Sequence, residues 1–390
     1  TPCYVYSSRS ILGRFRAYEE ALEGSPHLIC YSVKANANLA VLHLLAEAGA
    51  GFDIVSGGEL YRVLKAGGRA SRVVYSGAGK TAAEIEYALK EGIYSFNCES
   101  EGEISLLEGL AARAGRKARV ALRVNPDVDA ATHPYITTGL RHNKFGVSSG
   151  EAERIYRRIS GSAHLLPEGV SFHLGSQILD VRVILEGLDR VLALAERLRA
   201  AGLPIRWLDL GGGLGIRYKP QDEAPSIANF VGQVRRRIEG RGLSLVLEPG
   251  RSIVGEGGVL LTRVLYRKRN GEREFVIVDA SMTDLLRPSL YKAHHEILPA
   301  RETSRPPIWA DVVGPVCESG DFLAKDREIA NVLPGDLLAV ATAGAYGFAL
   351  SSNYNARPRA AEVLVEGSSW RVTRARETYE DLIRGESSPS

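Results

Sequence analysis

The sequence predicts an α/β protein: a (β/α)8 TIM barrel followed by a C-terminal antiparallel β domain. Eight short apolar runs alternate with helical patterns between residue 28 and about residue 250. Polar and glycine-containing segments follow the carboxyl ends of these runs, which is where barrels of this type carry their active sites. After about residue 260, helical patterns become rare and short β-type runs alternate with Pro and Gly turns.

The eight predicted barrel strands are nearly continuous apolar runs, as expected of parallel strands that are buried on both faces. Eight strands and their helices in roughly 230 residues match the barrel count. An open doubly wound sheet has the same periodicity and stays the competing architecture. The predicted strands are Leu28–Val33, Gly51–Val55, Arg72–Tyr75, Tyr94–Asn97, Arg119–Val124, Gly169–His173, Trp207–Leu210 and Ser244–Leu247.

Helical patterns fill the intervals between these strands. The segment Asn38–Ala48 places Leu42 and Leu45 on one face. Thr81 followed by Glu84 is typical of a capping box at a helix start. The other predicted helices are Ser10–Glu23, Gly58–Ala66, Thr81–Lys90, Ser100–Ala114, Gly150–Ser160, Val181–Ala201 and Ile227–Gly240.

These patterns predict two domains, a barrel over residues 26–258 and a β domain over residues 259–384. We expect the N-terminal segment 1–25 to join the β domain, because its run Cys3–Tyr6 has no role in the barrel. The β runs of the second domain are Gly258–Leu265, Phe275–Asp279, Ile308–Val313, Leu337–Thr342, Ala361–Val365 and Trp370–Thr373.

Composition excludes several classes of protein. The 390 residues include 49 basic and 46 acidic side chains, a net charge of +3, which is too balanced for a nucleic-acid partner. Four cysteines without a C-x-x-C pair indicate neither a metal site nor a disulfide framework, so we expect a cytoplasmic protein. No uncharged run is typical of a membrane span. Because the chain begins at Thr1, we expect an upstream segment to have been removed or left out.

A lysine stands at the end of the first predicted strand. Lys34 follows apolar residues, and burial there would lower its pKa, as an amine that forms a Schiff base requires. Taken alone, Lys34 is slightly better explained as a lysine that snorkels from the barrel rim. Lys144 is the rival candidate, but it lies in a long polar segment where a charge costs little.

The sixth, seventh and eighth strands are followed by groups that suit a phosphorylated ring. Gly211–Gly215 contains four glycines, whose bare backbone N–H groups can surround a phosphate. Glu248 could hold a pyridinium proton and Arg251 a substrate carboxylate, although an internal ion pair between them is about as well supported. His173 could stack on a flat ring or act as a base, although a core position is the default for an isolated histidine.

The β domain adds three candidate segments. Arg287–Tyr291 offers a second carboxylate clamp, and Tyr346 lies on a glycine turn. Cys317 and Glu318 lie together in a segment that ends at Gly320, which favours an exposed proton-transfer role over ordinary burial of the thiol. A lysine, a phosphate cradle, a pyridinium partner and a ring-stacking histidine together are the parts that pyridoxal phosphate needs.

On these residues the chain resembles the diaminopimelate decarboxylases, which belong to the alanine-racemase-like, fold-type III group of pyridoxal phosphate enzymes. The resemblance runs in order from about Thr1 to about residue 380. The motifs that carry it are Tyr31–Asn36, His173–Gln177, Gly211–Gly215, Glu248–Arg251, Cys317–Ser319 and Gly344–Tyr346.

The resemblance implies a role for each matched position. Lys34 would carry the cofactor, His173 would stack on its ring, and Cys317 would reprotonate the substrate carbon. Cys317 and Glu318 would reach the site from a second subunit, so the implied active unit is a homodimer. Cofactor binding would fall to Lys34, Asp53, His173, Ser176, Gly211, Gly212, Gly213, Glu248, Gly250, Arg251 and Tyr346, and substrate binding to Arg251, Arg287, Tyr291, Glu318 and Tyr346.

The implied reaction is decarboxylation of the amino acid meso-diaminopimelate to L-lysine, the last step of lysine biosynthesis, with no metal. Three alternatives stay open at this point. A related decarboxylase for ornithine, arginine or a polyamine precursor would not need Arg251 and Arg287 together. A racemase would need bases on both faces of its substrate. A non-catalytic carrier would have no need to retain Lys34 and Cys317.

Overall fold

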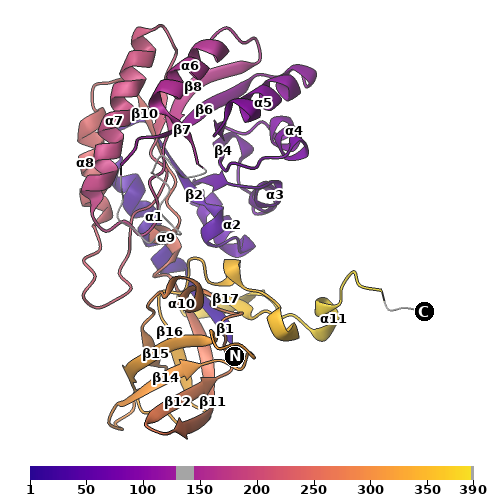
Figure 1. Ribbon diagram of the computed structural model, residues 1–390, viewed down its shortest axis with the longest axis vertical. Helices are drawn as coiled ribbons and strands as arrows, with labels where there is room; N and C mark the ends of the chain where they lie inside the picture. Colours follow the sequence, from indigo (N-terminus) through magenta and orange to yellow (C-terminus); the bar gives the residue numbers. More distant parts are fainter. Residues whose placement is uncertain (129–144, 388–390) are drawn as a thin grey trace. The chain divides into compact units, whose positions relative to one another are not determined.

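The computed structural model describes residues 1–128 and 145–387. Contacts divide the chain into two compact units (Figure 1). The barrel unit comprises Leu12–Ile216 and Glu223–Ser252, and the β unit comprises Thr1–Ile11, Arg217–Asp222 and Ile253–Ser390.

The domain limits expected from the sequence stay a prediction, and the contacts divide the chain slightly differently. Helix α1 (Ser8–Ala21) passes from the β unit into the barrel unit. Phe15 and Tyr18 of this helix are buried, as is Leu22 just after it, and the Tyr18 hydroxyl lies 2.7 Å from the Ser252 hydroxyl. Residues 12–25 therefore belong to the barrel unit, whereas the sequence analysis placed them with the β domain.

Eight parallel strands close into a barrel, so the doubly wound alternative is wrong. The strands follow one another around the barrel, and the circle is closed by the pairing of β5 with β6 and of β10 with β2. A strand of two residues, β7 (Val147–Ser148), pairs with β6. The barrel strands are β2 (His27–Ser32), β3 (Gly51–Ile54), β4 (Val73–Tyr75), β5 (Ser95–Cys98), β6 (Ala118–Asn125), β8 (Leu165–Ser171), β9 (Trp207–Asp209) and β10 (Ser244–Leu247).

Helices surround this barrel, as the sequence predicted (Figure 1). Asn38 caps one helix, and Thr81 with Glu84 forms the predicted capping box of another. The bounds of these helices are α2 (Leu39–Glu47), α3 (Gly57–Lys65), α4 (Ala82–Glu91), α5 (Glu101–Arg113), α6 (Ser149–Ile159), α7 (Val181–Ala200) and α8 (Ile227–Ile238), with a short α9 (Arg251–Val254) after β10.

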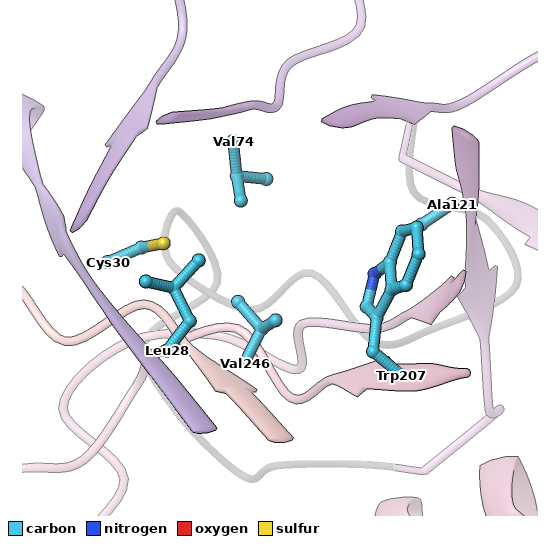
Figure 2. Close-up of a cluster of buried hydrophobic side chains, with 6 residues drawn as sticks. All are labelled: Leu28, Cys30, Val74, Ala121, Trp207 and Val246. Carbon is cyan, nitrogen blue, oxygen red and sulfur yellow. The ribbon is translucent and has the colours of Figure 1, made fainter. Parts of the chain in front are cut away.

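The barrel interior is apolar toward the amino ends of the strands. Trp207 is the largest member of a buried cluster, and Tyr94 packs against it from outside the cluster. Gly169 on the neighbouring strand is required there, because a Cβ atom would lie 2.1 Å from the Trp207 Nε1. Figure 2 shows the six cluster side chains, which are Leu28, Cys30, Val74, Ala121, Trp207 and Val246.

The same interior becomes polar two residues further along each strand. Side chains at positions i and i+2 of a strand share one face, so each inward apolar residue is followed by another inward residue nearer the carboxyl end. Val246 is followed in this way by Glu248, and Trp207 by Asp209. Both carboxyl groups are buried. Strand alternation therefore places acidic groups just beneath the barrel mouth.

The β unit is built on one nine-stranded sheet. Most of its pairings are antiparallel, and two are parallel, β1 with β17 and β12 with β14. The sequence analysis missed β13, β15 and two short helices, α10 (Arg287–Tyr291) and α11 (Tyr379–Leu382). The strands are β1 (Cys3–Ser7), β11 (Gly258–Asn270), β12 (Arg273–Val278), β13 (Ile297–Pro299), β14 (Ile308–Val313), β15 (Phe322–Ile329), β16 (Leu337–Val340), β17 (Ala361–Glu366) and β18 (Ser369–Arg374).

Candidate active site

A cavity of about 330 Å³ opens at the carboxyl ends of the barrel strands. That volume is at the lower end of the range for small-molecule sites. The lining residues come from loops and strand ends that lie far apart in the sequence, and several are the polar residues predicted to form a site. They are Lys34, Val55, Ser76, Gly77, Asn97, Arg123, Phe145, Ser171, Phe172, His173 and Glu248.

Lys34 lies directly after β2, in a single 3₁₀ turn (Val33–Ala35). Its Nζ donates a hydrogen bond of 2.8 Å to Oδ2 of Asp53, which is fully buried at 0% exposure. The Ser32 hydroxyl donates to the same oxygen at 2.7 Å. Two donors on one oxygen fix the carboxylate, and the carboxylate in turn holds the lysine amine at the cavity wall.

Glu248 lies in the floor of the cavity and takes part in a network of buried polar groups. Its Oε1 accepts hydrogen bonds from the Ser76 hydroxyl at 3.1 Å and from Asn97 Nδ2 at 3.2 Å. The same Asn97 nitrogen donates to Oδ2 of Asp209 at 2.7 Å. Burial, and then the nearby carboxylates of Asp209 and Asp53, raise the pKa of Glu248 well above its ordinary value.

His173 presents a neutral ring to the cavity. The backbone N–H of Gly212 donates to its Nδ1 at 3.2 Å, so that nitrogen holds a lone pair and the proton is on Nε2. Burial, with the charges of Arg123 and Lys34, lowers the pKa of His173 well below its ordinary value. A neutral, buried imidazole suits ring stacking better than base catalysis.

The glycine run is shaped by close contacts with its own barrel. A Cβ atom on Gly212 would lie 2.2 Å from the Glu248 carbonyl oxygen, and one on Gly213, whose φ is +107°, would lie 2.5 Å from the Gly175 carbonyl oxygen. Beside this run, Arg251 Nη2 donates to the Ser176 hydroxyl at 2.9 Å. Glycine is therefore required for packing at positions where a ligand contact was predicted.

Several polar groups around the cavity still lack partners in the described part of the chain. The buried side-chain oxygens Asn97 Oδ1 and Ser171 Oγ accept and donate no hydrogen bond there. The backbone N–H groups of Gly213 and Gly250 likewise have no acceptor among the described residues. Pyridoxal phosphate needs groups of the kinds found here: the amine of Lys34 held by a buried carboxylate, the neutral ring of His173, the acid Glu248 and backbone N–H donors. The residues present therefore fit that cofactor.

The predicted substrate residues Arg287 and Tyr291 belong to the β unit, on α10. Arg287 is 5% exposed, its Nη1 lies 2.9 Å from His295 Nε2, and its guanidinium lies over the ring of Tyr218 at 4.4 Å. Tyr291 is only partly buried. The β unit thus fixes Arg287 firmly from within.

Cys317 and Glu318 are exposed on the loop that joins β14 to β15. The loop is rigidly held, because the buried Asp321 accepts the N–H of Met282 at 2.6 Å and that of Val316 at 2.7 Å. Tyr346, also in the β unit, has a φ of +56° on its glycine turn. The structure therefore presents the thiol and the carboxylate outward from a fixed loop.

The sequence analysis assigned no role to several residues that the structure brings to the site. Asp209 was read as part of a strand, although a carboxylate inside an apolar run was a usable signal. Asn97 and Arg123 fell within the predicted strands Tyr94–Asn97 and Arg119–Val124, and nothing in the sequence marked Ser76. The rival lysine, Lys144, lies outside the described residues.

Residues 8–255 match the family model of the pyridoxal-dependent decarboxylases, specifically their pyridoxal-binding domain. Together with the closed barrel and the site at its mouth, this match defines a pyridoxal phosphate-dependent decarboxylase of fold type III. The diaminopimelate decarboxylase of Pseudomonas aeruginosa is 54% identical over 99% of this chain and 93% of that relative. The diaminopimelate decarboxylase of Aquifex aeolicus is 50% identical over 98% of this chain and 91% of that relative.

The solved structures agree. The crystal structure of diaminopimelate decarboxylase from Helicobacter pylori complexed with L-lysine superimposes with a TM-score of 0.95. It shares 46% identity and covers 98% of this chain and 96% of that one. The chain belongs to the diaminopimelate decarboxylase family. In the part that the structure describes, no helix has the length and apolar character needed to cross a membrane.

Proposed function

We propose that this protein catalyses the pyridoxal phosphate-dependent decarboxylation of meso-2,6-diaminopimelate to L-lysine and carbon dioxide. The observation that carries the proposal is one barrel-mouth cavity that gathers Lys34, His173 and Glu248, in a chain whose relatives are named for this reaction. When bound, the cofactor supplies a ring that accepts the electron pair left behind by departing carbon dioxide.

Lys34 is the residue proposed to hold the cofactor covalently through its Nζ. Asp53, fixed by Ser32, orients that amine toward the cavity, which keeps the reacting nitrogen in one position. His173 lines the cavity with a neutral imidazole, so it can lie flat against the ring without adding a competing charge. The backbone of Gly211–Gly213 and Gly250, with Ser176 and Arg251, is proposed to hold the phosphate.

Glu248 is proposed to supply the proton on the ring nitrogen. Its raised pKa means that the carboxyl group carries a proton until a basic nitrogen is placed beside it. With the cofactor bound, the Glu248 carboxyl group would share this proton with the ring nitrogen, an interaction that burial would strengthen. Asn97 and Ser76 hold the accepting oxygen in place, and Asp209 adds negative charge beneath it.

The remaining residues are proposed to bind the substrate selectively and to protonate it after carbon dioxide has left. Arg251, Arg287 and Tyr291 bind the distal carboxylate, Glu318 binds the distal ammonium, and Tyr346 takes part in holding the phosphate or the substrate. Cys317 then donates its thiol proton to the substrate carbon that has lost carbon dioxide.

We infer that the active unit is a homodimer with shared sites. Cys317 and Glu318 are exposed on a loop that Asp321 holds rigid, which is what a residue pair offered to a second subunit requires. We also propose a cytoplasmic location. All four cysteines are free, as is usual in a reducing compartment.

Purified protein supplied with pyridoxal phosphate tests the function. We expect equimolar carbon dioxide and L-lysine from meso-diaminopimelate, and no release from ornithine or arginine. Borohydride reduction followed by peptide mapping should place the cofactor label on Lys34. A label on Lys144, turnover of ornithine in place of diaminopimelate, or a racemised product without carbon dioxide would each contradict the proposal.

A further inference from the structure

His295, a residue that no step above uses, is the most deeply buried partner of Arg287. Its side chain is 0% exposed, and its ring is held at both nitrogens. Nε2 lies 2.9 Å from Arg287 Nη1, and Nδ1 lies 2.8 Å from the Ala341 carbonyl oxygen. Tyr218 meets the imidazole edge-on, with ring centroids 5.4 Å apart and planes 80° apart.

These two hydrogen bonds define the protonation state of His295. A guanidinium nitrogen can only donate, so Nε2 must hold a lone pair. A carbonyl oxygen can only accept, so Nδ1 must carry the proton. His295 is therefore a neutral imidazole in its Nδ1–H form, and one Arg287 N–H points at it.

Two neighbours orient the guanidinium of Arg287. His295 accepts one of its N–H groups, and the ring of Tyr218 lies against the group with its centroid 4.4 Å away. Both of these neighbours are uncharged. The chain fixes His295 in turn, because Ala341 N–H donates to the Glu296 carbonyl oxygen at 2.8 Å beside the β13–β16 pairing.

We propose that His295 is a positioning residue for substrate selection: its Nε2 lone pair aims the Arg287 guanidinium at the distal carboxylate of the substrate. This inference rests on the proposed function, since it takes Arg287 to be the carboxylate ligand. It makes the preference for substrates with a second carboxylate depend on a histidine that does not touch the substrate.

The test uses two substitutions that separate the ring nitrogens. His295→Gln can keep an acceptor where Nε2 lies, and His295→Asn can keep a donor where Nδ1 lies while losing the acceptor for Arg287.

Two inhibitors of the holoenzyme, L-lysine and 1,5-diaminopentane, differ by a single carboxylate. His294→Gln and His294→Asn are matched controls on the neighbouring histidine, which pairs with Glu296 instead.

We expect His295→Asn to raise KM for diaminopimelate and the L-lysine inhibition constant by about 10-fold or more, the effect of losing one hydrogen bond to a charged group. kcat and the 1,5-diaminopentane constant should stay within about threefold, because neither depends on the distal carboxylate. His295→Gln and both His294 variants should stay close to the wild type.

Equal effects of Asn and Gln, or equal weakening of both inhibitors, would overturn the inference and leave His295 a structural residue. Should His295→Asn fail to fold, His295→Gln decides alone: near-wild-type L-lysine inhibition supports the inference, and a loss of about tenfold or more refutes it. A wild-type protein that does not decarboxylate diaminopimelate would instead refute the proposed function, so the two failures are distinguishable.

Discussion

Replacing Glu248 by Gln is expected to raise the stability of the cofactor-free protein while lowering activity. An acid whose pKa is raised by folding keeps its proton in the folded state and loses it earlier in the unfolded state. Its contribution to stability is complete below the unfolded pKa and is lost as pH rises through the folded pKa. Glutamine resembles the protonated acid at every pH, so Glu248→Gln should not show that loss.

The neighbouring Asp209 gives the size of the effect. Folding raises its pKa to about 6 from 3.8, and about 1.4 kcal/mol for each pKa unit gives about 3 kcal/mol. Glu248 is buried in the same network, and its pKa is raised in the same direction. With an unfolding entropy of about 2.1 cal/mol/K per residue over 390 residues, about 3 kcal/mol corresponds to about 4 °C in Tm, and we expect the Tm of Glu248→Gln to lie above that of the wild type at about pH 8.

Thermal unfolding of the cofactor-free wild type and the Glu248→Gln variant, at about pH 4 and about pH 8, measures this difference. The two proteins should unfold together at the lower pH and separate at the higher one. Glu239→Gln, a substitution of an exposed glutamate in the barrel unit, is the control and should change neither value. A variant that is less stable than the wild type at the higher pH would refute the reasoning.

Three further predictions concern activity. Lys34→Ala should reduce carbon dioxide release to background and abolish borohydride-fixed cofactor, measured by peptide mapping; a retained label elsewhere would contradict the assignment. Arg287→Ala should raise KM for diaminopimelate by about 30-fold or more, because truncating a buried charged contact costs about 2–5 kcal/mol, and near-normal turnover at low substrate would contradict it. Cys317→Ala should lower kcat by about 10²- to 10⁴-fold with little change in KM, as loss of a proton donor does, whereas Cys3→Ser should be neutral.

The barrel could be predicted from the sequence because its signals are local. Each strand is an apolar run, and helix starts are marked by groups such as Thr81, which the structure confirms as a cap. Closure of the barrel depends on the pairing of β5 with β6 and of β10 with β2. These pairings produce no periodic pattern in the sequence. The barrel was therefore favoured over the doubly wound sheet only by where the polar residues lie.

Site residues that follow the end of a strand could be predicted from the sequence. Site residues that lie inside a strand could not. Lys34 and Glu248 stand after apolar runs, and so they were conspicuous in the sequence. Asp209 lies within its strand, and its proximity to Glu248 through Asn97 exists only once the barrel has closed. His295 follows a similar rule, because its partner Ala341 is distant in the chain.

The position of the carboxyl groups also links the stability of the barrel to its chemistry. On β2, β4, β6, β9 and β10, strand alternation places a polar residue above an apolar one, and the packed lower cluster supports the fold (Figure 2). The upper layer buries Asp209 and Glu248 close to Asp53, and burial together with the nearby carboxylates raises the pKa of both Asp209 and Glu248. A cationic ring at Glu248 would relieve that repulsion, whereas glutamine relieves it permanently and cannot supply the proton. The group whose removal stabilises the empty barrel is thus the group that the reaction requires.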